Sequence, residues 1–392
     1  MMKHCTGSFK VALTGLCLVL GGCSSLSSGL DAINPFTPSK KVAQPAELQP
    51  VQTSSSASRT WQGSIGAAGE FTFTPSVVGD SVFVAARDGA VARLDKDGNV
   101  VWKISLSQTL SGGVGSDGKR VVVGTPKGEV LTLDAADGKT LWRAQMGSEI
   151  LSAPALTGDL VVVRSGDSRI NGFDAVSGKR RWLYQRATPA LVLRSHVGVQ
   201  VDGNATLVGF PGGKLVAISN QNGVALWEGT VTLPKGATEL ERIADITSRP
   251  AVNGGTVCSA TYQGRVACFD RANGNLLWSR DMSSSAGLDI DSKYVYVADD
   301  SGSVHALDRS SGASLWKQDK LLNRQLTRPM AIGNEVLVAD LQGFVHILRQ
   351  SDGAFVGRLA TDGSAVRGEL VRTSTGALVQ TVNGGLFAIA AK

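Results

Sequence analysis

The chain has 392 residues, and its 39 lysines and arginines exceed its 33 aspartates and glutamates by a small margin, for a formal net charge of +6 at pH 7. No run of basic residues accompanies this excess, so the charge argues against a nucleic-acid-binding protein. With only five cysteines, cysteine use is sparse.

Residues 1–22 are predicted to be a signal peptide that is not part of the fold. Lys3 and Lys10 precede an apolar stretch, Val11–Leu20, that is too short to span a bilayer. The stretch leads into Leu-Gly-Gly-Cys, which resembles the lipobox of bacterial lipoproteins, where the cysteine is lipidated and becomes the new N-terminus. The resemblance implies a lipid on Cys23. The alternative is an ordinary secretory signal with an incidental cysteine.

The residues after Cys23 suggest where such a lipoprotein resides and how it is attached. Ser24 stands where an aspartate is associated with inner-membrane retention in enteric bacteria, which favours the outer membrane, facing the periplasm. Residues 24–58 are rich in Ser, Pro, Ala and Gln and have no apolar period. Residues 23–58 are therefore expected to be the lipidated N-terminus and a flexible tether, with a typical reach of roughly 30–35 Å.

Tryptophans recur along the rest of the chain at intervals of about 40 residues, which predicts an array of supersecondary units. A similar phrase precedes each one after the first, as in Leu133–Trp142 (LDAADGKTLW) and Leu307–Trp316 (LDRSSGASLW). One large ring per unit, at a fixed position, is expected to fill the wedge between neighbouring units. These structural tryptophans are Trp61, Trp102, Trp142, Trp182, Trp227, Trp278 and Trp316.

Each unit reads as four short strands, because apolar runs rich in Val alternate with Gly, Asp, Asn and Ser turns. No run has a sustained helical period, so helix content is expected to be very low. The last copy, Leu386–Lys392, lacks its outermost strand, while the strand that carries Trp61 has no unit of its own. The prediction is an all-β, eight-bladed β-propeller with four-stranded blades over residues 59–392, closed by pairing of the N-terminal strand into the last blade.

The sequence lacks the motifs of common catalytic and metal sites. It has no Ser/His/Asp motif, phosphate loop, Cys-x-x-Cys pair or metal-ligand pair at helical spacing, so neither a cofactor nor a metal is expected. His305 and His346 occupy equivalent places in consecutive units and are read as solvated strand residues. Cys258 and Cys268 flank one predicted hairpin. A two-residue turn would point them to opposite sides and a three-residue loop would place them opposite each other; both are read as buried apolar fillers.

The units differ in length mainly at one place. The connections into the fourth and fifth units carry insertions of about five and eleven residues, and insertions concentrated on one face of a ring usually mark a binding face. The first inserted loop offers Leu191, Val192 and Leu193 beside Arg194, and the two leucines are expected to share one face while Val192 takes the other.

The second inserted loop offers Leu240, Ile243 and Ile246 beside Arg242 and Asp245. An apolar cluster flanked by arginine and acid suits a protein partner. The alternative is that both loops pack their aliphatic side chains onto the blades.

Two family resemblances follow from these residues. The phrase in Asp134–Trp142 resembles the tryptophan-docking motif of eight-bladed pyrroloquinoline-quinone dehydrogenases. Those enzymes add a calcium-binding and catalytic set over the centre of the ring, often with adjacent cysteines, and this chain has neither such a pair nor an insertion long enough to build the cap. This resemblance therefore supports the fold and says little about chemistry.

The lipobox, the tether, the eight units and the two inserted loops together resemble the BamB family, a lipoprotein of the outer-membrane β-barrel assembly machinery (BAM complex). In that family the first loop has leucine, a small polar residue, leucine and arginine, which bind the periplasmic POTRA domains of BamA. The resemblance implies this role for Leu191, Leu193 and Arg194, with Val192 replacing the polar residue. Two aspartates occupy the family's second loop. Asp245 matches the first, which implies a partner-binding role, and Thr247 stands at the second.

The resemblance implies a non-enzymatic scaffold that is lipid-anchored to the outer membrane and assists folding and insertion of outer-membrane proteins. Exposed blade edges would also offer pairing sites to unfolded outer-membrane protein substrates. The alternatives are a periplasmic enzyme like the quinoprotein dehydrogenases and a lipoprotein that binds cell-wall polysaccharide.

Overall fold

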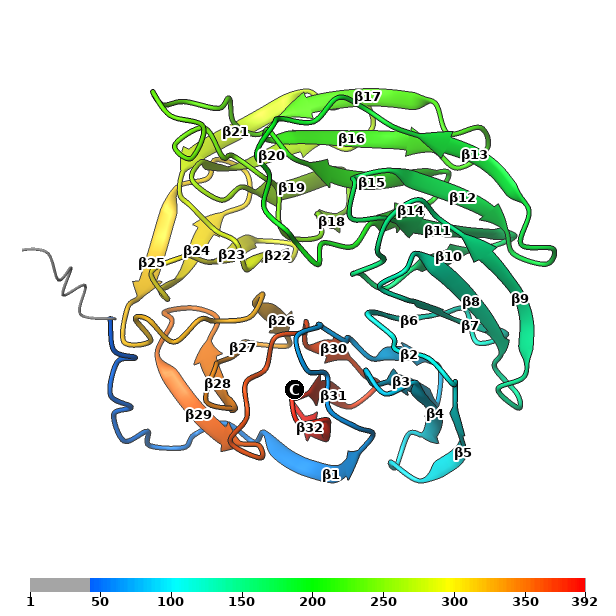
Figure 1. The fold of residues 1–392 in the computed structure, drawn as a ribbon. Helices are drawn as coiled ribbons and strands as arrows, with labels where there is room; N and C mark the ends of the chain where they lie inside the picture. The colour runs from blue at the N-terminus through cyan, green and yellow to red at the C-terminus, as the bar shows by residue number, and fades with distance from the viewer. Residues whose placement is uncertain (1–42, 392) are drawn as a thin grey trace, which may run out of the picture. The chain divides into compact units, whose positions relative to one another are not determined.

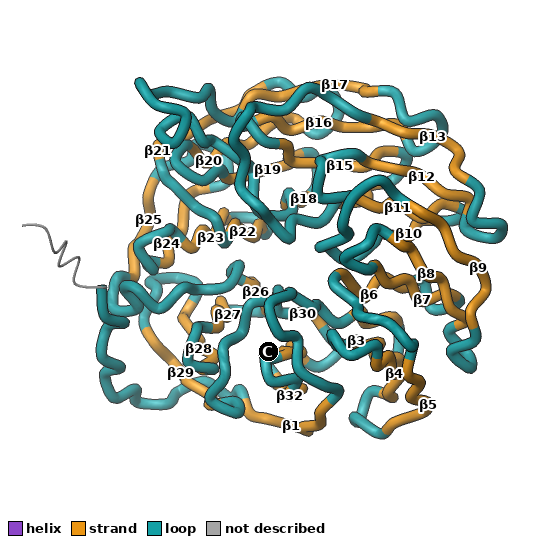
Figure 2. Tube along the Cα trace, viewed as in Figure 1, coloured by secondary structure: helices purple, strands orange, loops and turns teal. Residues whose placement is uncertain are grey.

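The computed structural model describes residues 43–391, which consist of strands joined by turns and loops, with no helix among them (Figure 2). Within this range no helix is therefore available to cross a membrane. The strands form eight four-stranded antiparallel sheets arranged as blades in a ring (Figure 1). The prediction of an all-β, eight-bladed β-propeller is confirmed. The signal peptide, Cys23 and residues 24–42 lie outside the described range.

The first four blades follow one another along the chain. Blade one contains β2 (Ser76–Val78), β3 (Ser81–Ala85), β4 (Ala90–Asp95) and β5 (Val100–Ser105). Blade two contains β6 (Gly112–Ser116), β7 (Arg120–Gly124), β8 (Glu129–Asp134) and β9 (Thr140–Gln145). Blade three contains β10 (Ala155–Thr157), β11 (Leu160–Arg164), β12 (Ile170–Asp174) and β13 (Arg180–Tyr184). Blade four contains β14 (Gln200–Asp202), β15 (Ala205–Phe210), β16 (Lys214–Ser219) and β17 (Ala225–Thr230).

The next three blades repeat the pattern, and the eighth combines both ends of the domain. Blade five contains β18 (Ala251–Asn253), β19 (Thr256–Ala260), β20 (Arg265–Asp270) and β21 (Leu276–Asp281). Blade six contains β22 (Gly287–Ile290), β23 (Tyr294–Ala298), β24 (Val304–Asp308) and β25 (Ser314–Gln318). Blade seven contains β26 (Met330–Ile332), β27 (Glu335–Ala339), β28 (Phe344–Arg349) and β29 (Phe355–Ala360). Blade eight contains β30 (Val371–Arg372), β31 (Gly376–Gln380), β32 (Gly385–Ala390) and β1 (Ser58–Ser64).

The ring closes in blade eight, where β1 is the outermost strand. It pairs antiparallel with β32, so that Ser58 lies opposite Ala390 and Ser64 opposite Gly385. The predicted closure by the N-terminal strand is confirmed.

The place of a strand in its blade explains its sequence. The second and third strands are covered on both faces by neighbouring blades, so they read as nearly unbroken apolar runs, and β11 (LVVVR) is buried at every position. The outermost strands alternate instead: in β9 the side chain of Trp142 is buried while Leu141 and Arg143 are exposed. Apolar clusters therefore lie between consecutive blades, one of them built jointly from β7, β8, β11 and β12.

Each tryptophan ties its blade to the next one. The indole Nε1–H donates a hydrogen bond of 2.8–3.0 Å to a backbone carbonyl of the following blade, as Trp142 does to Ala175. The ring covers a turn glycine: Gly178 has a φ of 69°, and an added Cβ there would come within 2.7 Å of the Trp142 ring. A side chain at this turn would strain the backbone and collide with the indole. The bonds are made by Trp61, Trp102, Trp142, Trp182, Trp227, Trp278 and Trp316.

The segment before β1 differs from the expected flexible tether. The amide of Ala46 donates to the carbonyl of Leu322 at 2.8 Å, and the amides of Ser54 and Ser55 both donate to the carbonyl of Val356 at 2.9 Å. Residues 46–57 thus pack against blades six and seven. Composition does not reveal this, because the partners that satisfy the backbone of the segment lie far away in the sequence.

The two cysteines of the folded domain are joined, which corrects their interpretation as unpaired apolar fillers. Cys258 in β19 and Cys268 in β20 lie directly opposite each other, with their Cα atoms 4.1 Å apart, and form a disulfide. The amide of Thr261 donates to the carbonyl of Arg265, so the hairpin loop has three residues, and that length produces this register.

The two histidines are also not the solvated residues that the pattern predicts. His305 is 8% exposed and His346 is fully buried. The Nε2 atom of each lies within hydrogen-bonding distance of an aspartate of the same blade, Asp299 at 2.8 Å and Asp340 at 2.9 Å. Across residues 43–391 no group of three or more His, Cys, Asp or Glu could hold a metal ion.

Candidate functional site

The two inserted loops lie on one face of the ring. Because the four strands of a blade alternate in direction, every blade ends, and the next begins, on the same face. We call this the loop face; the opposite far face carries the turn between the third and fourth strands. The insertions are residues 185–199, between β13 and β14, and residues 231–250, between β17 and β18, so both are on the loop face.

The first inserted loop exposes apolar side chains at its tip. Leu191 is 39% exposed and Val192 36% exposed, while Leu193 is only partly exposed. Exposure therefore does not follow the expected alternation, in which both leucines share one face and Val192 takes the other. The segment is not a strand, so a period of two residues does not govern where its side chains point.

Asp245 lies under this loop and not on the surface. It is 2% exposed, and its carboxylate accepts hydrogen bonds from the amides of Leu193 at 2.7 Å and Gly212 at 3.1 Å. The buried guanidinium of Arg164 is nearby: burial lowers the Arg164 pKa to about 10, and the negative charge of Asp245 opposes that shift. In this structure Asp245 therefore positions the first loop, and its carboxylate is not presented to a partner.

Arg194 is held at the surface by a carboxylate that the sequence did not single out. Its Nε donates to Oε1 of Glu149 at 2.9 Å and its Nη2 to Oε2 at 2.7 Å. The Arg194 side chain remains 52% exposed and that of Glu149 27% exposed. This bidentate bond lowers the pKa of Glu149, so the pair stays ionised at neutral pH. Glu149 belongs to the preceding loop-face connection, and only the three-dimensional path of the chain identifies it.

The second inserted loop contributes less apolar surface than the sequence suggests. Leu240 is 66% exposed, but Ile243 and Ile246 are 7% and 1% exposed and pack inward. Thr247, at the family's second aspartate position, donates its hydroxyl to the carbonyl of Ser285 at 3.0 Å. For Ile243 and Ile246 the alternative interpretation, in which the loop packs its aliphatic side chains onto the blades, is therefore the correct one.

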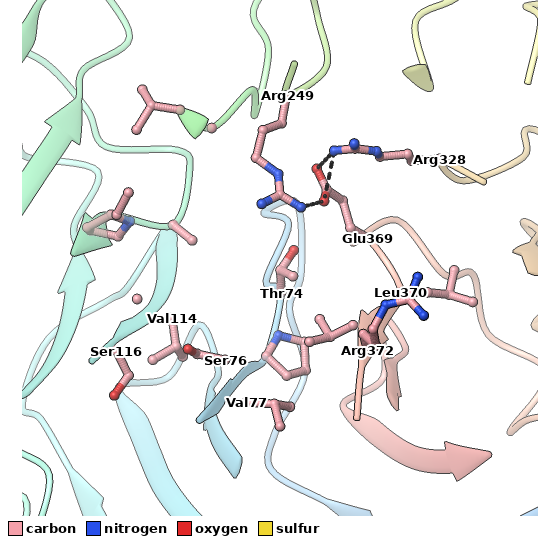
Figure 3. Close-up of a pocket in the computed structure, with 18 of the residues that line it drawn as sticks. Thr74, Ser76, Val77, Val114, Ser116, Arg249, Arg328, Glu369, Leu370 and Arg372 are labelled. Atoms are coloured by element: carbon pink, nitrogen blue, oxygen red, sulfur yellow. Dashed lines mark hydrogen bonds and ion pairs between the residues drawn. The ribbon is translucent and has the colours of Figure 1, made fainter. Parts of the chain in front are cut away.

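A cavity of about 410 Å³ lies among the innermost strands, and charged side chains cross it (Figure 3). Glu369 accepts from Arg249 at 2.8 Å and lies 3.4 Å from Arg328, so the connections that enter blades five, seven and eight are joined here. Burial raises the pKa of Glu369, but the two arginines outweigh it and lower the value to about 2. A second hydrogen bond ties Arg249 to Gln200 at 3.1 Å. The negative charge of Glu369 is thus paired with the positive charges of Arg249 and Arg328.

Comparisons with known proteins agree along most of the chain. A family model described as outer membrane protein assembly factor BamB matches residues 87–318. A protein of that name from Bordetella pertussis is 42% identical over 383 residues, which cover 97% of this chain and 96% of that protein. Its namesake from Pseudomonas aeruginosa is 44% identical over 360 residues, covering 91% of this chain and 92% of the other.

Solved structures give the same result for the fold. BamB from Moraxella catarrhalis aligns with a TM-score of 0.79 at 27% identity, covering 85% of this chain and 99% of that one. A quinohemoprotein alcohol dehydrogenase from Comamonas testosteroni aligns with a TM-score of 0.69 at 14% identity, covering 85% and 76%. The second likeness concerns the fold alone. From the match over nearly the whole length, at 42% identity, this chain belongs to the BamB family of outer membrane protein assembly factors.

Proposed function

We propose that this assembly factor binds the periplasmic POTRA domains of BamA through Leu191, Leu193 and Arg194, which we call the docking patch. We also propose that Cys23 carries the lipid that anchors it to the inner leaflet of the outer membrane, facing the periplasm. One observation carries the docking proposal: apolar side chains and an arginine stand exposed on a loop that Asp245 and Glu149 hold in place.

Fixation of the loop favours binding. Ordering a loop on association costs free energy, roughly 0.5–1.5 kcal/mol for each side chain immobilised. The loop is already ordered in the free protein. Its Leu193 amide is bonded to Asp245, and Arg194 makes two bonds to Glu149, so less ordering remains to be done on association. A pre-formed patch of this kind presents its leucines without refolding.

Arg194 contributes substantially to the free energy of binding only when the partner buries it. In solvent a half-exposed ion pair is worth about 0–1 kcal/mol. A partner that buries Arg194 and Glu149 removes water from both charges, and the arginine then contributes by pairing with Glu149, with an acid of the partner, or with both.

As a member of this family, the chain is a non-enzymatic assembly factor, although dehydrogenases share its fold. We propose that it acts within the BAM complex as a scaffold that holds the POTRA domains and so assists folding and insertion of outer-membrane proteins.

Affinity capture of the lipidated protein from detergent-solubilised envelope tests both parts. BamA should be recovered with the wild type and lost with Leu193→Ala combined with Arg194→Ala. The Cys23→Ala variant should be neither acylated nor sedimented with outer membrane. Equal recovery of BamA with the doubly substituted protein would reject the docking patch.

A further inference from the structure

Residues 46–57, which we call the strap, are held along blade seven by interactions at several points. Near its start the carbonyl of Ala46 accepts from Arg324 Nη1 at 2.9 Å, and the carbonyl of Gln49 accepts from Arg358 Nη1 at 2.8 Å. Leu48 packs against a cluster that includes Leu321. The strap then reaches the carbonyl of Val356 at the beginning of β29. In Figure 1 it is the dark blue segment beside β29.

The two arginines that grip the strap belong to one buried chain of polar groups. Arg324, 2% exposed, donates its Nε–H to Asp340 at 2.7 Å. Asp340 is bonded to Nε2 of His346 at 2.9 Å, and Nδ1 of His346 lies 3.1 Å from Nε of Arg358. Since buried charges are costly unless they are paired, Arg324 is fixed by its bond to Asp340, and the part-buried Arg358 is oriented by its bond to His346.

Blade six repeats the His–Asp pair, but among the described residues no hydrogen bond joins residues 46–57 to its outermost strand, β25. There His305 bonds to Asp299 at 2.8 Å, and the residue opposite His305 on the outermost strand is Lys317, which is exposed. In blade seven that place, opposite His346, is taken by Arg358. The neighbouring residue also differs: blade six has Trp316, and blade seven has Gly357, where an added Cβ would lie 3.3 Å from Ser55. Blade seven is thus adapted to receive the strap.

The strap changes the face on which the chain leaves the ring. As the outermost strand of blade eight, β1 begins on the far face, so Ser58 lies there. Leu322 and Arg324 belong to the connection between β25 and β26, which lies on the loop face. Between Ala57 and Ala46 the strap therefore follows β29 from the far face to the loop face. Six residues of strand span about 20 Å.

We infer that the strap is a positioning element, held by Arg324 and Arg358, that makes the N-terminal segment emerge on the same face of the ring as the docking patch. The inference rests on the proposed anchoring at Cys23 and docking to BamA for its functional meaning, but the path of the strap stands by itself. Membrane attachment and partner docking then act on one face. Without the strap, the tether would leave from the opposite face.

Distance measurements on the full-length lipidated protein in nanodiscs test the path. Spin labels are placed at Glu47→Cys together with Lys320→Cys on the loop face, or with Ser351→Cys in the far-face turn before β29. All three residues are exposed. A single short distance from 47 to 320 and a longer one, by about 20 Å, from 47 to 351 are expected. Broad distributions or the reverse order would overturn the inference.

Substitution of Arg358, which holds the strap, tests the positioning role. Arg358→Ala should broaden the distance from 47 to 320 and speed amide exchange in the strap, while Lys317→Ala, the matched position in blade six, should change neither. Solution affinity for a purified POTRA fragment should stay within twofold in Arg358→Ala, whereas capture of that fragment by protein anchored in vesicles should fall several-fold. Unchanged capture with a released strap would overturn the positioning role. If the wild type captures no POTRA fragment, the docking proposal fails. The path of the strap is then tested by the spin-label distances alone.

Discussion

The carboxylate of Asp245 accepts a hydrogen bond from the backbone amide of Leu193, 52 residues earlier in the chain, at 2.7 Å. This contact joins the two inserted loops. It makes the second loop a support for the first, so the acid contributes to docking through the backbone of its neighbour.

Asp245→Ala is expected to weaken POTRA binding and to destabilise the fold together. It leaves two part-buried amides, of Leu193 and Gly212, without their acceptor, which costs at most about 1–3 kcal/mol each. Calorimetry of binding, thermal unfolding and amide exchange of residues 185–199 measure the effect, and Thr247→Ala is the control. Lost binding with unchanged exchange and stability would show instead that Asp245 touches the partner.

The docking patch is expected to be separable from stability. Leu193→Ala and Arg194→Ala should each cost about 1–3 kcal/mol of binding free energy, with Leu191→Ala similar or smaller. Melting temperatures should hardly change, because these side chains are at the surface. Leu240→Ala, on the adjacent loop and 66% exposed, is the matched control. Losses of binding that merely follow losses of stability would mean that the loop is structural.

Val192 calls for its own measurement, because it is nearly as exposed as Leu191. Val192→Ala removes two methyl groups, each worth about 0.8 kcal/mol on full burial, from a side chain that is already mostly covered, so it should reduce affinity by less than about 1 kcal/mol. An effect as large as that of Leu193→Ala would place the centre of the interface at the tip of the loop.

Removal of the disulfide is expected to lower the free energy of unfolding. Replacing Cys258 and Cys268 by Ala opens a loop with a sequence separation of 10 residues, for which chain entropy gives about 2–3 kcal/mol. Denaturant unfolding with and without reductant measures the loss. POTRA binding should fall less than stability does, because neither cysteine belongs to the docking patch and the hairpin reaches it indirectly, through the bond from the Tyr262 amide to the Asp245 carbonyl at 2.9 Å. Equal midpoints for both forms would contradict the prediction.

Acidification is expected to weaken blade seven. Burial lowers the pKa of His346, against the opposing effect of Asp340, so the folded state resists protonation there. The unfolded chain takes up that proton near pH 6.5. It therefore binds more protons than the folded state below this pH, and the free energy of unfolding falls as pH drops, by at most about 1.4 kcal/mol per pH unit for this group.

The pH effect can be separated from that of other residues. Burial also lowers the pKa of His196, which acts in the same direction. The difference in unfolding free energy between wild type and His346→Gln, followed from pH 7.5 to 5, isolates His346. Parallel curves for the two proteins would refute its contribution.

The sequence predicted the ring because its information is repetitive. Each junction between blades consists of one tryptophan and a glycine turn in the next unit, as with Trp142 and Gly178, so it can be recognised from the sequence. The strap and the burial of Asp245 were not predictable in this way. Their partners, such as Arg358 for Gln49, lie up to 309 residues away in non-repeating segments, and neither hydrophobic period nor composition records such pairs. The role of Glu149 as the partner of Arg194 was not predicted for the same reason.

The pairing of β1 with β32 also has a consequence for the order in which the domain can fold. Residues 58–64 are synthesised before blades one to seven, and their partner strand, residues 385–390, is synthesised after them. Blade eight is therefore the last sheet that can be completed, and until then the sides of blades one and seven that border it have no neighbour. The seven earlier blades can assemble in order, but only the completed eighth blade covers both ends of the array.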